Sequence, residues 1–299
     1  MITQNKYFLS LRLPFLTVSI IPFIFGSTIG HHSFSWLKFF LGLFAVIFLH
    51  LGANLINDYA DSRSGCDWKD SRRYGFFGGS KMIQQGKLTE KFYLLFAIFC
   101  VGLSLVFIVL MTVVMGDLKT VFYGSLIIIL AWFYSAKPFQ FAYKGIGELI
   151  IFLLFGPALV MGGYYIQTGI FPDLEPFMLS LPLGFFTMAI LFCNEIPDYV
   201  VDKAANKNNW VVRIGPQKSY VMFFLIIIGG FATVIVNVGM GFLDKLALVT
   251  ILLLLLGLKA GYVLKRHYNY KEKLILASKL TVLMHNLVGL GLIIVGGLA

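Results

Sequence analysis

Long apolar runs recur along this chain of 299 residues, and each is about as long as a helix that crosses a lipid bilayer. About 20 apolar residues are needed for one crossing. Only 13% of the residues are charged, whereas soluble proteins carry about 25%. We therefore expect an all-α, polytopic membrane bundle that forms a single domain over residues 1–299. Polar interruptions predict about nine transmembrane helices, near residues 13–32, 37–57, 91–115, 118–135, 146–167, 178–196, 218–240, 244–263 and 278–298. The first run is long enough to span, so we expect no cleavable signal peptide.

The distribution of basic residues predicts which side of the membrane each loop faces. All but four of the 24 Lys and Arg residues lie in the N-terminal arm, in every second loop after it or at the adjoining helix ends; the exceptions are Lys38, Lys119, Lys245 and Lys259. Because basic loops stay on the cytoplasmic side, we expect a cytoplasmic N-terminus and an external C-terminus in the cell membrane. The net charge of +10 then matches anionic lipid and a phosphorylated substrate. No motif for nucleic-acid binding accompanies the charge, so we expect no nucleic-acid partner.

Two clusters of acidic and amide residues each end an apolar run on the predicted cytoplasmic side. The first is Asn54–Asp61, followed by Asp67, and the second is Asn194–Asp202. Ionisable groups at membrane depth are costly and are functional candidates by default. Carboxylate oxygens are the ligands that Mg²⁺ prefers, and Mg²⁺ commonly binds one or two carboxylates together with substrate phosphates. The two clusters therefore suggest one site that holds divalent metal against a diphosphate.

Helical spacing within the clusters supports this interpretation. Residues four apart share one face of a helix. Four pairs have this spacing: Asn54 with Asp58, Asn57 with Asp61, Asn194 with Asp198, and Asp198 with Asp202. The alternative is that each acid only caps a helix end and pairs with nearby Lys or Arg, but such caps do not require the repeated spacing.

The chain resembles the UbiA superfamily of intramembrane aromatic prenyltransferases over nearly its whole length. The family's first motif, Asn-Asp-x-x-Asp followed by a further Asp, matches Asn57, Asp58, Asp61 and Asp67. Its second motif, Asp-x-x-x-Asp, matches Asp198 and Asp202. The segments from Tyr134 to Pro138 and from Tyr143 to Glu148 resemble the region between spans four and five. Arg12-Leu-Pro14 resembles the Arg-Pro start of the family's first helix.

This resemblance implies Mg²⁺-dependent transfer of a polyprenyl group from an allylic polyprenyl diphosphate to an aromatic acceptor, in a bundle of nine helices. It implies that Mg²⁺ is held by the acids Asp58, Asp61, Asp67, Asp198 and Asp202. The residues expected to bind the diphosphate are Arg12, Asn54, Asn57, Lys81, Lys137, Lys144, Asn194 and Lys207. The residues expected to act in catalysis are Asp61, Asp198, Tyr134 and Lys137.

The gap before Asp67 resembles the branch of the family that prenylates 1,4-dihydroxy-2-naphthoate in menaquinone biosynthesis, and we expect that acceptor. Two departures weaken this assignment: Gly78-Gly79-Ser80-Lys81 replaces the Gly-Pro-Leu-Arg-like stretch that this branch often has, and Asn206–Asn209 leaves one cation where the family usually has two. Other acceptors remain open: 4-hydroxybenzoate, homogentisate, and a tetrapyrrole or haem. A cation-coupled secondary transporter is the alternative from another class.

Three further residues have two interpretations each. His50 lies one turn before Asn54 and either orients a ligand or is a satisfied intramembrane histidine. Glu148 and Glu195 either act as a base for the acceptor hydroxyl or pair with neighbouring Lys and Arg, and we favour pairing.

Overall fold

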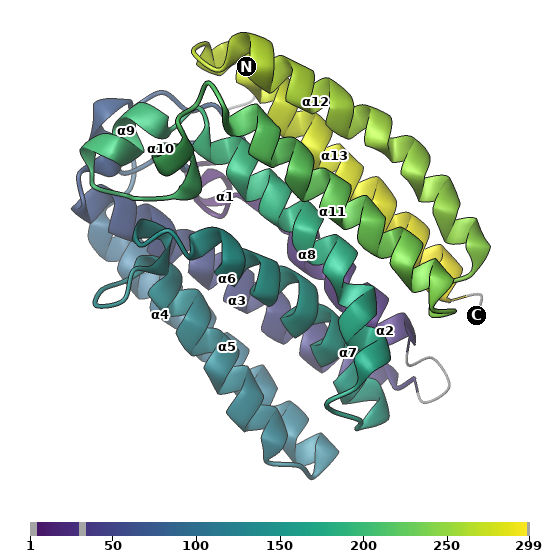
Figure 1. Ribbon diagram of the computed structural model, residues 1–299. Helices are drawn as coiled ribbons and strands as arrows, with labels where there is room; N and C mark the ends of the chain where they lie inside the picture. The colour runs from purple at the N-terminus through teal and green to yellow at the C-terminus, as the bar shows by residue number, and fades with distance from the viewer. Residues whose placement is uncertain (1–4, 30–33, 298–299) are drawn as a thin grey trace.

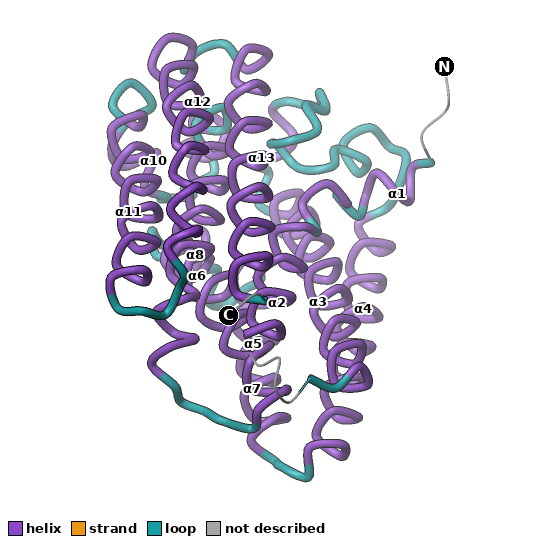
Figure 2. Tube along the Cα trace, turned by 90° about the vertical axis from the view of Figure 1, so that its right-hand side faces the viewer, coloured by secondary structure: helices purple, strands orange, loops and turns teal. Residues whose placement is uncertain are grey.

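The structure is a computed structural model that describes residues 5–29 and 34–297. These residues form helices and loops with no strand among them, as the colouring of Figure 2 shows. The predicted all-α class is confirmed. Figure 1 shows long helices running side by side, with the short helices α9 and α10 gathered at one end.

Nine apolar helical segments occur within the described residues, matching the predicted number. Seven are long enough to cross a membrane by length and composition, and two are shorter. The long segments are α3 (Trp36–Arg63), α4 (Glu90–Met115), α6–α7 (Gly147–Thr168), α8 (Leu174–Glu195), α11 (Ser219–Gly239), the segment ending in α12 (Lys245–His267) and α13 (Lys271–Gly296). The shorter ones are Leu13–Ile29, which contains α2 (Thr17–Ile29), and α5 (Lys119–Ser135).

Two of these segments change winding along their length. α6 (Gly147–Leu153) and α7 (Leu159–Thr168) are joined by a π-helical stretch at Leu154–Ala158 that contains Pro157. The turn of wider helix accommodates the proline, which cannot donate a backbone hydrogen bond. A 3₁₀ stretch at Lys245–Leu253 leads into α12 (Leu254–His267).

The helix boundaries differ most from prediction where polar residues adjoin an apolar run. α3 continues to Arg63 rather than stopping near residue 57, because no Gly or Pro lies between residue 57 and the Ser64-Gly65 turn. Gly65 then takes a φ of 80°, a left-handed conformation that glycine adopts without steric cost. α13 likewise starts at Lys271 rather than near residue 278, in good helix formers. Predicted positions 30–32 and 298 lie outside the described residues.

Two groups of helices flank the centre of the bundle. α3 packs on α4 and α5, while α8 packs on α11 and α13, and α13 packs on α12. α2 and α7 pack on one another between these groups, as Figure 1 shows. A side chain on Gly26 of α2 would clash with the backbone of Val160 on α7. Small residues thus allow these two helices to approach closely, as is common in membranes.

The ends of α3 and α8 meet at the same end of the bundle. Four short helical segments cover this end: Cys66–Lys69, Phe141–Tyr143, α9 (Tyr199–Ala204) and α10 (Trp210–Ile214). The Cys66–Lys69 turn contacts both α3 and α9. It thereby lies between the helices that carry the first and the second acidic cluster. α1 (Lys6–Ser10) precedes this region in the chain and leads to Arg12.

Candidate functional site

The first acidic cluster is fixed by the last two turns of α3. Asp58 and Asp61 are both buried. Asp58 Oδ2 accepts a hydrogen bond of 3.1 Å from the Ser80 amide, and Asp61 Oδ1 accepts one of 2.7 Å from the Tyr143 hydroxyl. Arg12 Nη1 lies 3.2 Å from Asn57 Oδ1 and 3.5 Å from Asp58 Oδ1. The Arg12 guanidinium, the Ser80 amide and the Tyr143 hydroxyl therefore hold these side chains in place.

Asp67 folds back beside this helix end after the turn at Gly65. Its Oδ1 accepts a hydrogen bond of 2.7 Å from the Lys81 ammonium, which also donates to the Asp67 carbonyl at 3.2 Å. Both side chains are buried, with exposed fractions of 8% and 4%. Burial and the neighbouring Asp61 carboxylate raise the pKa of Asp67 more than Lys81 lowers it. The carboxyl group therefore gains a proton more readily than an exposed aspartate.

The second cluster lies at the junction of α8 and α9. Asp198 Oδ2 accepts a hydrogen bond of 3.0 Å from the backbone amide of Gly78. Asp202 Oδ2 accepts one of 2.8 Å from the side-chain amide of Asn209. The Cys66 thiol lies 3.2 Å from Asp202 Oδ1. Burial also raises the pKa of Asp202, as the nearby Asp198 and Asp61 carboxylates do, against the effect of Lys207.

Lys207 connects the two clusters. Its ammonium lies 3.5 Å from Asp61 Oδ2 and 3.8 Å from Asp202 Oδ1. Burial disfavours the charged ammonium, but the carboxylates of Asp202 and Asp61 outweigh it and raise the pKa of Lys207. The lysine is therefore charged and partly neutralises the acids that it joins.

The loop Gly78–Lys81 also joins the two clusters through its backbone. The Gly78 amide binds Asp198 of the second cluster, and the Ser80 amide binds Asp58 of the first. Gly79, between them, has a φ of 72°, and a Cβ there would lie 3.0 Å from Asp58 Oδ1 and 3.1 Å from Asp67 Oδ2. Only glycine leaves the two carboxylates undisturbed at this position.

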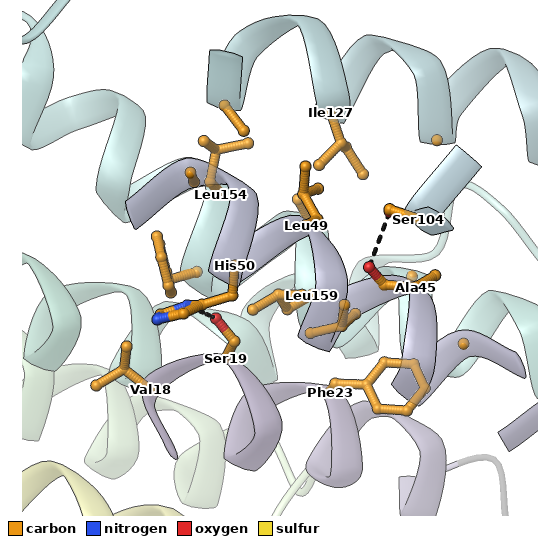
Figure 3. Close-up of a pocket in the computed structure, with 18 of the residues that line it drawn as sticks. Val18, Ser19, Phe23, Ala45, Leu49, His50, Ser104, Ile127, Leu154 and Leu159 are labelled. Carbon is orange, nitrogen blue, oxygen red and sulfur yellow. Dashed lines mark hydrogen bonds between the residues drawn. The ribbon is translucent and has the colours of Figure 1, made fainter. Parts of the chain in front are cut away.

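The clusters line a polar pocket of about 100 Å³ that adjoins a larger apolar cavity of about 320 Å³. The same five residues line both spaces: Arg12, Asn57, Tyr134, Leu191 and Asn194. The apolar cavity lies between α2, α3, α4, α5, α7 and α8, and Figure 3 shows part of its lining. A charged group can therefore occupy the polar end while an apolar chain attached to it occupies the cavity.

The donor atoms of the pocket fit Mg²⁺ by their chemistry. They are carboxylate oxygens, which hard divalent cations prefer. Among the described residues, no three acidic, histidine or cysteine side chains converge in a geometry that would hold a metal on their own. The ammonium groups of Lys81 and Lys207 lie against these oxygens instead. Such a set suits a cation that takes its remaining ligands from a substrate.

Most of the residues predicted for the site lie together, but two do not. Lys137 and Lys144 are exposed, and neither lines the polar pocket or the cavity. Lys137 lies two residues beyond the end of α5, and the backbone carbonyl of Lys144 accepts a hydrogen bond from Arg213. Asn54 lines the apolar cavity alone, whereas Asn194 lines both spaces and accepts a hydrogen bond from Ser278. Their predicted contact with diphosphate remains a prediction.

Sequence reasoning missed several contacts of the acids. Tyr143 and Asn209 lay within or beside recognised segments, but nothing in their spacing pointed to Asp61 or Asp202. Lys271 lies 3.7 Å from Asp198 Oδ1 although it is far away in sequence, and no pattern could have indicated this contact. Cys66 next to Asp67 carried no signal beyond its position.

The favoured ion pairing of Glu148 and Glu195 was wrong. Neither carboxylate forms an ion pair with a described Lys or Arg. Glu148 instead accepts a hydrogen bond from the Trp210 backbone amide, because α10 starts beside α6. Glu195 lines the polar pocket.

Comparison with known proteins agrees with this arrangement. The model of the UbiA prenyltransferase family matches residues 19–287. The chain is 28% identical to the UbiA prenyltransferase domain-containing protein 1 of Rattus norvegicus over 221 residues, which are 73% of this chain and 63% of that protein. It thus spans less than two thirds of that relative's length. It is 27% identical to the 1,4-dihydroxy-2-naphthoate octaprenyltransferase of Mycobacterium leprae, over 71% of this chain and 70% of that one.

A solved structure has the same fold. This is the UbiA homologue of Archaeoglobus fulgidus bound to GPP and Mg²⁺, with a TM-score of 0.68 and 18% identity over 97% of this chain and all of that one. The paired acidic motifs, the helical bundle and the family match over most of the chain lead to one assignment. The protein is a multi-pass integral membrane enzyme of the UbiA prenyltransferase family.

Proposed function

We propose that this enzyme transfers a polyprenyl group from an allylic polyprenyl diphosphate to 1,4-dihydroxy-2-naphthoate. Prenyl transfer is the reaction of its family. The observation that carries the proposal is the polar pocket with five aspartates at or beside it, directly adjoining an apolar cavity. A diphosphate and its isoprenoid tail differ in polarity in the same way as these two spaces.

Five carboxylates are proposed to hold Mg²⁺ at the diphosphate: Asp58, Asp61, Asp67, Asp198 and Asp202. When bound, Mg²⁺ neutralises the diphosphate and stabilises it as a leaving group. The solved A. fulgidus homologue, bound to GPP and Mg²⁺, supports this choice of cofactor. The ammonium groups of Lys81 and Lys207 pair with the same carboxylates, so a bound cation would displace them and leave them free to bind phosphate oxygens.

Arg12, Lys81 and Lys207 are proposed to bind the diphosphate. Arg12 and Lys207 line the polar pocket, and Lys81 lies behind Asp67. Tyr134 lines both spaces, so its ring can face the allylic carbon as positive charge develops there. The apolar lining excludes water, which would otherwise capture the allylic cation. The chain's own residues thus bind the leaving group, shield the cation and confine the tail.

Two observations support the naphthoate acceptor. The spacing from Asp61 to Asp67 resembles the naphthoate branch, and the M. leprae relative is named for that acceptor. Attack by the carboxylated ring carbon would form a bond to the allylic carbon. Loss of carbon dioxide would then return the electron pair of the broken carbon–carboxyl bond to the ring. The mass of the product is therefore lower, by one carbon dioxide, than the mass of an alkylated acceptor that keeps its carboxyl group.

The basic loops support an orientation with the N-terminus and the acidic pocket in the cytoplasm and the C-terminus outside. A diphosphate donor made in the cytoplasm would then reach the polar pocket directly. Accessibility of single cysteines placed in the Asp70–Arg73 loop and near Asp117 tests this: the first should react only from the cytoplasmic side.

The proposed reaction is tested with purified protein, Mg²⁺, a polyprenyl diphosphate and separate aromatic acceptors, followed by mass analysis. Naphthoate should give a prenylated product without the carboxyl group. A product only with 4-hydroxybenzoate, homogentisate or haem would keep prenyl transfer and overturn the acceptor. No Mg²⁺-dependent release of diphosphate with any acceptor would overturn the reaction itself.

A further inference from the structure

A buried polar pair lies in the wall of the apolar cavity. His50 on α3 and Ser19 on α2 face one another, with 2.6 Å between His50 Nδ1 and Ser19 Oγ (Figure 3). Both residues line the cavity, and their exposed fractions are only 8% and 3%. Ser19 thereby fixes the imidazole ring between two transmembrane helices.

The other ring nitrogen of His50 has no hydrogen-bond partner among the described residues. A buried polar atom without a partner carries a desolvation penalty that a bound polar group would relieve. His285 on α13 has a similarly unpaired Nε2, but it does not line the cavity. His50 lines a substrate-sized space and keeps an unpaired ring nitrogen at its wall, which distinguishes it from an ordinary buried histidine.

The position of His50 along α3 limits which substrate can reach it. His50 lies seven residues before Asn57, or about 10 Å along the helix from the polar pocket. The diphosphate is held at that pocket in the proposed function, and an isoprenoid tail carries no polar atoms. A polar group next to His50 Nε2 must therefore belong to the second substrate.

We propose that His50, held by Ser19, binds a hydroxyl group of the aromatic acceptor and so selects and orients it. This assignment rests on the proposed function and specifies the acceptor's subsite. A phenolic hydroxyl can both donate and accept, so it pairs with Nε2 in either tautomer of the imidazole. Pairing at one hydroxyl fixes the rotation of the ring, and thus which ring carbon faces the allylic carbon.

Thr187 on α8, which also lines the cavity, offers a second unpaired atom. Its Oγ1 is buried without a partner among the described residues. A ring with two polar substituents can supply partners for both Nε2 and Oγ1. Acceptors with a single polar substituent would leave one of these atoms unpaired, which favours the more highly substituted ring.

Steady-state kinetics of His50→Leu, His50→Gln and Ser19→Ala tests the assignment. His50→Leu should lower kcat/KM for the acceptor about 10- to 100-fold, the loss expected for an unmade hydrogen bond in a buried site, with KM for the polyprenyl diphosphate unchanged. His50→Gln keeps a polar side chain and should restore part of the loss. Ser19→Ala should give a smaller loss because only the orientation of the ring is relaxed.

His285→Leu is the matched control because it removes another buried histidine with an unpaired nitrogen. It should leave kcat/KM for both substrates unchanged in folded protein. Wild type should also prefer the hydroxylated acceptor over its methyl ether, and His50→Leu should lose this preference. A merely structural histidine would not change that ratio.

Equal acceptor kcat/KM in wild type, His50→Leu and His50→Gln would overturn the inference. So would an equal rise of KM for both substrates, because that indicates general damage to the bundle. Failure of the proposed function looks different: wild type would then release no diphosphate on addition of Mg²⁺ and acceptor.

Discussion

The Lys207 ammonium lies 3.5 Å from Asp61 Oδ2, although 146 positions separate the two residues in the sequence. Asp61 ends α3, and Lys207 follows α9 beyond the second acidic motif. The contact unites the two motifs into one pocket. It also places a cation where a bound diphosphate would need one.

Replacement of Lys207 by Ala should weaken binding of the diphosphate. A lost charge-assisted hydrogen bond costs about 1.5–3 kcal/mol, so kcat/KM for the polyprenyl diphosphate should fall about 10- to 100-fold. Steady-state kinetics measures the effect. Lys203→Ala is the control, because Lys203 is exposed and its ammonium donates only to the Tyr199 hydroxyl among the described polar groups. Equal losses in the two variants would contradict the assignment.

Lys137→Ala and Lys144→Ala should each retain activity within about twofold, because exposed charges contribute little. Both side chains lie outside the two pockets. Measurement of kcat/KM for the polyprenyl diphosphate distinguishes this outcome from the sequence-based expectation. A loss as large as that of Lys207→Ala would restore the role that the sequence predicted for them.

Gly79→Ala should lose more activity than Gly86→Ala, although the two variants should lose similar stability. Both Gly79 and Gly86 have positive φ, so Ala at either position should cost about 1–2 kcal/mol of stability. Only at Gly79 does the new methyl group meet the carboxylates, at 3.0 Å from Asp58 and 3.1 Å from Asp67, while nothing lies within 4 Å of a Cβ at Gly86. Thermal unfolding and activity should therefore separate the two variants. Equal activity in Gly79→Ala and Gly86→Ala would show that the loop does not position the acids.

Affinity for Mg²⁺ should fall as the pH is lowered from about 8 to about 6. Burial raises the pKa of Asp67 to about 7 and that of Asp202 to about 6. Protons therefore compete with the cation in this range, and one such proton weakens binding about tenfold over two pH units. Calorimetry of Mg²⁺ binding at saturating polyprenyl diphosphate, in buffers of different ionisation enthalpy, should detect release of protons beyond those that Mg²⁺ releases from the diphosphate alone. Asp244→Asn, at the start of the Lys245–Leu253 segment, is the control and should leave the pH dependence of Mg²⁺ affinity unchanged. A constant Mg²⁺ affinity over this pH range in wild type would contradict the prediction.

Much of the fold could be predicted from hydropathy. The bilayer sets the helix length, and loops such as Gly116–Leu118 are polar or contain glycine, so the nine segments were visible. The end of α3 could not be predicted in this way, because its last turns are polar and their helical state depends on burial beneath the covering loops. Polar helix ends of this kind lie outside the reach of hydropathy.

The acids of the site could be predicted, but most of their partners could not. Asp61 and Asp202 stood out because a carboxylate at the end of a membrane-spanning helix carries a high desolvation cost. Their partners Tyr143 and Lys207, and the backbone amides of Gly78 and Ser80, come from loops whose course depends on tertiary packing. Lys137 and Lys144 resembled site residues in sequence but face solvent. His50 needed the structure, because only the facing Ser19 and the cavity distinguish it.

The central claim is that both acidic motifs form one Mg²⁺–diphosphate site. A double-mutant cycle with Asp61→Asn and Asp202→Asn, read as Mg²⁺-dependent prenyl transfer by folded protein, tests it most directly. Residues that act as one unit are not additive, so each single variant should lose nearly as much activity as the double variant. Full activity in the double variant, or losses that multiply as those of independent sites do, would contradict the claim.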